Sequence, residues 1–217
     1  LPISVTEAAG HEVGILCDSS TGGEHEDRLF DTIRPQLSLG LTRIPMRRSI
    51  APSDLAALYR SYKHIKSLRP DILHGHGAKG GVLARLIGSA LRVNRYCVAR
   101  LYSPHGGSLH FDRSSLSGKV VLQLERFQER FGDALVFVCD YERRTYEEKV
   151  GKPLKTARVI YNGIGEAEFE PVPAWYQRGE LKQAAAGQQR NVVRAQQGVA
   201  GVAQCGRQVR RIEIGQG

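Results

Sequence analysis

The stretch from Asp71 to Ile87 limits the possible folds more than any other part of the chain. It opens, after Pro70, with a short apolar run typical of a buried parallel strand, which needs no polar alternation. Closely spaced glycines follow, and apolar residues then recur at helical spacing. Free N–H groups and the positive dipole end at such a helix N-terminus favour an anion. The stretch therefore predicts either a phosphate or sugar-phosphate site, or a turn whose glycines only allow close packing.

Other apolar runs repeat this alternation along the chain. Besides the run after Pro70, we expect strands at 11–18, 39–45, 96–103, 134–139 and 156–161, with helical patterns between them. The segment 117–131 is amphipathic, with one apolar side made of Val120, Val121, Leu124, Phe127 and Phe131. Strands separated by helices of this length indicate βαβ units. The predicted fold class is therefore α/β, a Rossmann-like parallel sheet flanked by helices.

The composition changes beyond Pro173. Gln, Gly, Ala and Arg dominate there, and large apolar residues are rare. Such a segment buries too little surface to offset the entropy lost on ordering. We expect one domain over residues 1–172, and a tail at 173–217 that is disordered or poorly packed.

The charge balance favours an anionic partner. The chain has 31 Lys and Arg against 22 Asp and Glu, a formal net charge of +9. Such a balance suits a phosphorylated substrate, an anionic membrane or nucleic acid. The alternative is a soluble basic protein whose charge only aids solubility. A non-catalytic basic module that binds nucleic acid or other phosphorylated ligands is thus an alternative. Because the tail has no aromatic residue beyond Tyr176 and the other basic residues are scattered, we expect no specific nucleic-acid binding. No apolar run reaches membrane-spanning length and no signal peptide opens the chain, so we expect a cytoplasmic location.

The cysteines and histidines are the candidate metal ligands of this chain. Four cysteines lie far apart without a CxxC pair, so the sequence predicts neither a structural zinc site nor a disulfide framework. His74 and His76 would share one face of a strand, and with His105 they could serve a metal hydrolase. No carboxylate at suitable spacing joins them, so the sequence predicts no metal.

Four predicted strands end in polar or glycine-rich turns. These turns are 18–20, 74–77, 103–107 and 162–163. Carboxyl ends of parallel strands meet at one sheet edge, where ligands bind in α/β folds. Together, the motifs at 10–13, 69–76, 103–107 and 159–164 resemble the N-terminal domain of family 4 glycosyltransferases, retaining enzymes of the GT-B fold. The resemblance runs from about Gly10 to Pro173.

The resemblance implies a hexosyltransferase that moves a sugar from a nucleotide-sugar donor to a glycan or lipid-linked acceptor, as in polysaccharide or glycoconjugate biosynthesis. It implies no cofactor besides that co-substrate. His105 would be the catalytic candidate near the donor sugar and acceptor. The substrate-binding candidates are His76, Gly77, Lys79, Gly80, Gly81, Ser103, Gly106, Gly107, Asn162 and Gly163. Arg47, Arg48 and Lys79 would suit a lipid-pyrophosphate acceptor and allow peripheral contact with the inner face of a membrane.

The chain also departs from the family pattern. A first strand with its Gly-Gly loop is missing before Gly10, which would leave an exposed central edge in the sheet. Nothing after Pro173 resembles the C-terminal domain that carries the nucleotide-sugar site in the family. We therefore expect the acceptor-side half of an enzyme, truncated at both ends and inactive alone.

Overall fold

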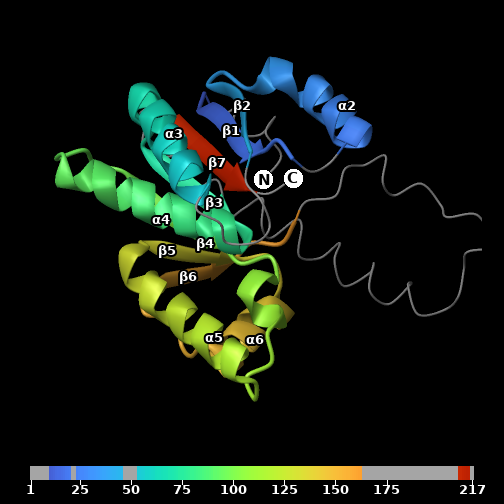
Figure 1. The fold of residues 1–217 in the computed structure, drawn as a ribbon, viewed down its shortest axis with the longest axis vertical. Coiled ribbons are helices and arrows are strands. Elements are labelled where there is room, and N and C mark those ends of the chain that lie inside the picture. The colour runs from blue at the N-terminus through green and yellow to red at the C-terminus, as the bar shows by residue number, and fades with distance from the viewer. Residues whose placement is uncertain (1–9, 21–22, 46–52, 163–209, 216–217) are drawn as a thin grey trace, which may run out of the picture.

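The computed structural model describes residues 10–20, 23–45, 53–162 and 210–215. Within them the chain forms a seven-stranded parallel sheet flanked by helices, with strand order β2-β1-β7-β3-β4-β5-β6 (Figure 1). The predicted Rossmann-like α/β fold is thereby confirmed. Among the described residues, no helix is long and apolar enough to cross a membrane.

The elements follow the predicted alternation. The strands are β1 (Glu12–Asp18), β2 (Gly40–Ile44), β3 (Ile72–His76), β4 (Ala99–Ser103), β5 (Ala134–Phe137), β6 (Thr156–Val159) and β7 (Arg210–Gly215). The α-helices are α2 (Gly23–Ile33), α3 (Ser53–Leu68), α4 (Gly77–Val93), α5 (Leu116–Gln128) and α6 (Asp140–Lys149). Short 3-10 helices are η1 (Arg34–Gln36), η2 (Gly107–His110) and η3 (Glu129–Phe131).

Strand β7 corrects two expectations about the ends of the chain. Residues 210–215 fall within the segment expected to be disordered or poorly packed, yet they form a strand between β1 and β3 (red in Figure 1). Ile212 and Ile214 are 2% and 0% exposed, so this strand contributes apolar side chains to the core. The centre of the sheet, expected to lack a strand, is therefore filled. Residues 173–209 lie outside the described part, as does the basic loop 46–49.

Helix α4 packs closely on one face of the sheet. Leu83, Ala84 and Ile87 of this helix join Leu73, Ile212 and Ile214 in the main apolar core, which also includes Ile65 of α3. The approach is so close that a Cβ on Gly80 would lie 2.2 Å from the carbonyl oxygen of Ile214. Gly80 and Gly81 were expected in a glycine-rich turn before the helix, but α4 begins directly after β3 and contains both glycines. Their demonstrated role is close packing of helix on sheet.

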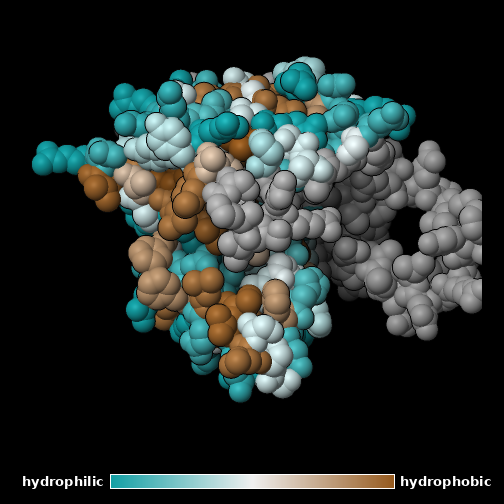
Figure 2. All heavy atoms as spheres, viewed as in Figure 1, coloured by the Kyte–Doolittle hydropathy of each residue, from teal (hydrophilic) through white to brown (hydrophobic). Residues whose placement is uncertain are grey.

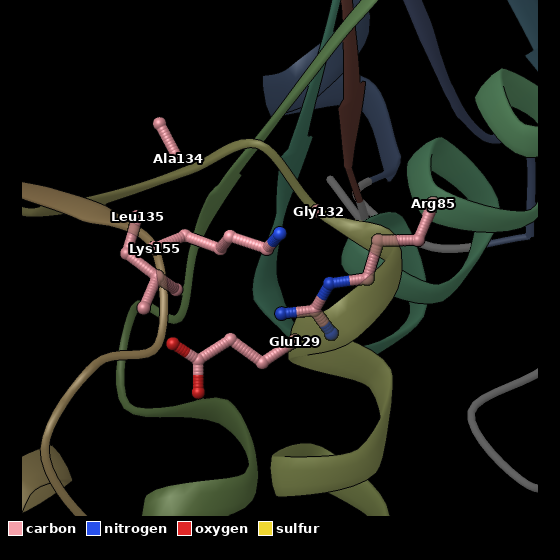
Figure 3. A pocket seen from close by; sticks show the side chains of 6 residues that line it. All are labelled: Arg85, Glu129, Gly132, Ala134, Leu135 and Lys155. Atoms are coloured by element: carbon pink, nitrogen blue, oxygen red, sulfur yellow. The ribbon is translucent and has the colours of Figure 1, made fainter.

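A polar network joins α4 to α5. The buried Arg85 guanidinium lies 4.0 Å from the Tyr102 ring centroid and donates to Glu125 at 3.0 Å. Glu125 also accepts hydrogen bonds from Ser108 and Tyr102. Beside it lies a small pocket that Arg85 and Lys155 enter from opposite sides, also lined by Glu129, Gly132, Ala134 and Leu135 (Figure 3). Arg85 and Glu129 already have ion-pair partners: Arg85 joins α4 to α5 through Glu125, and Glu129 pairs locally with Arg126.

Helix α5 has the predicted amphipathic pattern, but its apolar side faces outward. Val120, Leu124 and Phe127 are 62%, 50% and 50% exposed. Leu116 and Phe131 extend the same exposed set, whereas Leu122 packs inward. Figure 2 shows hydrophobic side chains gathered over this helix.

Candidate functional site

Two glycine-containing segments meet at the carboxyl edge of the sheet. The first is the junction of β3 with α4, and the second is the turn between β4 and η2. A Cβ on Gly107 would lie 3.1 Å from the backbone nitrogen of Ala78, in the first turn of α4. The turn therefore approaches the N-terminal end of α4, where backbone N–H groups are free to bind an anion.

His76 and His105 form the centre of this edge. His76 ends β3, and its Nδ1 lies 2.8 Å from Nε2 of His105. The ring centroids are 5.0 Å apart. The sequence-based expectation that these two histidines meet at one rim is thus met by the structure.

A third residue, Glu213 of β7, extends this pair. Its Oε2 lies 2.7 Å from Nε2 of His76 and 3.1 Å from Nδ1 of His74. Glu213 is the cross-strand neighbour of His74 in the β3–β7 ladder, and Arg211 pairs with its Oε1 at 2.6 Å. Although burial alone would raise the pKa of Glu213, its interactions with His74 and Arg211 and hydrogen bonds from both imidazoles hold it well below its usual value. Glu213 is therefore an anionic acceptor.

The anionic carboxylate fixes the direction of the hydrogen bonds. Because Glu213 can only accept, Nε2 of His76 is the donor to it, and in the tautomer protonated at Nε2 alone the Nδ1 atom has a lone pair. His105 then donates from Nε2 to that lone pair, which leaves its own Nδ1 as an acceptor. Desolvation and the neighbouring His76 lower the pKa of His105. In this arrangement Nδ1 of His105 is a hydrogen-bond acceptor suited to a hydroxyl group.

His74 lies deeper in the same cluster. Its side chain is 6% exposed, and Nε2 lies 2.9 Å from the hydroxyl of Ser103. Burial lowers the pKa of His74 to about 4, so the imidazole is neutral near pH 7. Ser103, a predicted substrate-binding residue, is itself buried and holds His74 in this structure.

The backbone at His105 is held in an unusual conformation. His105 has φ 49°, in the left-handed region that costs energy for a residue with a side chain. The buried carboxylate of Glu142 on α6 accepts from the next residue, Gly106, at 3.1 Å and from the amide of Val138 at 2.8 Å. Glu142 thus ties the turn to the end of β5 and positions His105.

Other predicted site residues lie around or away from this centre. Gly77 and half-buried Lys79 stand in the first turn of α4, and Gly106 and Gly107 form the opposing turn. Asn162 follows the edge strand β6, which β5 separates from β4, and no hydrogen bond among the described residues links it to the histidines. Gly163, Arg47 and Arg48 lie outside the described residues. A ligand-binding role for Gly80, Gly81 and Asn162 stays a prediction.

Sequence reasoning missed Glu213, Arg211 and Glu142. The first two lie in a segment whose composition indicated disorder, and 137 residues separate Glu213 from His76. A signal was present in the alternation of Ile212 and Ile214 with Arg211 and Glu213, a short strand pattern. Glu142 lies on α6, whose many charged residues give no signal that singles it out.

Most of the chain matches one known class of proteins. Residues 6–168 match Glycosyltransferase Family 4, and the chain belongs to this family. It is 31% identical over 168 residues to the putative glycosyltransferase EpsD of Bacillus subtilis, covering 75% of this chain and 39% of that protein. It is 26% identical over 185 residues to the Escherichia coli UDP-Gal:alpha-D-GlcNAc-diphosphoundecaprenol alpha-1,3-galactosyltransferase, covering 83% of this chain and 43% of that enzyme.

A solved structure supports the fold. HepE of Anabaena, crystallised with UDP and glucose, superposes with a TM-score of 0.50 at 15% identity over 81% of this chain and 50% of its own. At this identity the likeness concerns the fold alone. The chain spans about two fifths of the length of the curated relatives it matches.

Proposed function

We propose that this chain forms the acceptor-side half of a glycosyltransferase that uses a nucleotide-sugar donor. The observation that carries the proposal is the His76–His105 pair beside the N-terminal end of α4. The helix end suits the phosphate groups of an acceptor, and Nδ1 of His105 suits a sugar hydroxyl. Membership of Glycosyltransferase Family 4 supports the reaction class.

The proposed acceptor is a sugar diphosphate on a polyprenol lipid. The Escherichia coli relative acts on an acceptor of this kind according to its name. The net charge of +9 favours such an anionic substrate. The donor half of the reaction would be supplied outside residues 10–162 and 210–215, so we expect no sugar transfer by this chain alone.

The test is binding of GlcNAc-diphosphate carrying a short alkyl chain, measured by calorimetry on the purified chain. His105→Ala should weaken binding at least about tenfold, because a ligand hydrogen bond of about 1.4 kcal/mol is lost. His64→Gln is the matched control, since His64 lies on α3 and bonds Thr42. Equal affinity of wild type and His105→Ala would contradict the proposal. Transfer of galactose from UDP-galactose by this chain alone would contradict the expected inactivity.

Peripheral contact with a membrane is part of this proposal. The exposed apolar side of α5 carries Leu116, Val120, Leu124 and Phe127, and Arg130 lies near the Phe127 ring. Apolar side chains with neighbouring cations suit the surface of an anionic bilayer. Sedimentation with vesicles containing phosphatidylglycerol should carry the wild-type chain down, and Val120→Asp with Phe127→Asp should leave it in solution. Equal sedimentation of both proteins would refute the contact.

A further inference from the structure

We propose that His74, His76 and Glu213 bind a divalent transition-metal ion, most favourably Zn²⁺, which links β7 to β3. Among the described residues, their potential ligand atoms all lie within 4.8 Å of one another. The inference does not depend on the proposed sugar transfer, and it departs from the sequence expectation that the chain holds no metal. The site is built from residues on two neighbouring strands.

The spacing of the ligand atoms suits zinc. Two ligands at about 2.0 Å from a tetrahedral zinc ion lie roughly 3.3 Å apart. The corresponding distances are 3.1 Å from Glu213 Oε2 to His74 Nδ1 and 2.7 Å to His76 Nε2. Small side-chain rotations would therefore bring three ligands to one ion. Two imidazoles and one carboxylate form a donor set that favours zinc over calcium or magnesium.

The second ring nitrogen of each histidine also has a polar partner, as metal-bound histidines usually do. The second nitrogen of His74 bonds the buried hydroxyl of Ser103, which fixes the ring orientation. The second nitrogen of His76 contacts His105. Such partners orient metal-bound histidines and strengthen binding. The side chains of His76 and Glu213 are 34% and 21% exposed, which gives an ion access from solvent.

Arg211 competes with the ion for the same ligands. Its guanidinium pairs with Glu213 at 2.6 Å and also contacts Nδ1 of His74. Its buried Nε has no hydrogen-bond partner among the described residues, so this cation is only partly satisfied. Metal binding would take over the Glu213 and His74 contacts of Arg211. Removal of the arginine side chain should therefore strengthen metal binding.

The experiment is titration of the chelator-treated chain with Zn²⁺, and with Co²⁺ as a visible-absorption probe of coordination. We expect one ion per chain at this site, with a rise in the unfolding temperature because the ion binds the folded state. Glu213→Gln and His76→Ala should each weaken binding at least about tenfold, and Arg211→Met should strengthen it about tenfold. His64→Gln is the control and should bind as wild type.

Each outcome decides the proposal. Absence of binding, or binding that Glu213→Gln and His76→Ala leave unchanged, would overturn it. If those variants fail to fold, X-ray absorption of the wild-type zinc complex replaces them. Two imidazole ligands with oxygen neighbours would support the site, whereas thiolate ligation or one imidazole would overturn it.

Discussion

Glu213 and His76 lie 137 residues apart in the sequence, yet the carboxylate oxygen of one is 2.7 Å from Nε2 of the other. The contact forms because β7 pairs with β1 and β3 at the centre of the sheet, and it brings a negative charge to the carboxyl edge.

Ile214→Ala tests whether β7 is a true core strand. The Ile214 side chain is 0% exposed, so truncation should lower the free energy of unfolding by about 2–5 kcal/mol. Urea unfolding followed by circular dichroism measures the change. Leu116→Ala is the control, because its side chain is 81% exposed and its removal should change stability by less than about 0.5 kcal/mol. Similar losses in both variants would contradict the position of β7.

Gly80→Ala tests the close approach of α4 to β7. The new Cβ would lie 2.2 Å from the carbonyl oxygen of Ile214, a backbone atom that cannot rotate away. We expect the free energy of unfolding to fall by about 1–3 kcal/mol through overpacking. The matched variant Gly132→Ala, whose Cβ would meet its nearest neighbour at 3.5 Å, should remain near wild type. A Gly80→Ala protein as stable as wild type would show that the two elements lie further apart.

Arg85→Met tests the buried network between α4 and α5. The substitution leaves Glu125 as a buried carboxylate without its arginine, and such a loss costs about 3–5 kcal/mol. The double variant Arg85→Met, Glu125→Leu should recover part of the loss, which chemical denaturation can measure. Glu147→Gln on α6 breaks an exposed pair at 3.9 Å and should cost less than about 0.5 kcal/mol. A double variant less stable than Arg85→Met would argue against unpaired charge as the cause.

The lowered pKa of Asp133 predicts how the free energy of unfolding changes as the pH falls into the acid range. Burial works to raise the pKa of Asp133, but hydrogen bonds and charge from Arg100, with Arg92, lower it from its ordinary value of 3.8. A carboxyl with a lowered folded-state pKa stabilises the fold above its unfolded pKa. This stability is lost as pH falls from the ordinary value through the lowered one.

Asp133→Asn should therefore reduce the loss of stability below about pH 4, measured by urea unfolding over a pH series. Asp31→Asn removes an exposed carboxylate that lies 3.6 Å from Arg34, and it should keep the wild-type pH dependence. An unchanged acid profile in Asp133→Asn would refute this account.

The fold was predictable because its strands carry local signals. The runs at β1, β3 and β5 are apolar over several residues, and the order of strands and helices leaves few alternatives to a parallel sheet. The outward direction of α5 was not predictable, since an apolar stripe has the same pattern whether the core or solvent faces it.

The site was predictable in part. His76 and His105 follow neighbouring strands of a parallel sheet, so their meeting could be expected from chain order. Glu213 reaches them only through pairing of β7 with β3, a long-range contact for which no local pattern exists. The packing role of Gly80 and Gly81 could not be predicted either. A glycine needed for close packing and a glycine needed for the approach of a ligand look alike in sequence.

The central place of β7 has a consequence for biosynthesis. Strand β7 lies between β1 and β3 and pairs with both. The sheet therefore cannot be completed between β1 and β3 until the ribosome has made residues 210–215. Until then, each of them exposes an unpaired edge that invites association with other nascent chains. Efficient production of this protein should therefore depend on chaperone protection until residues 210–215 have been synthesised.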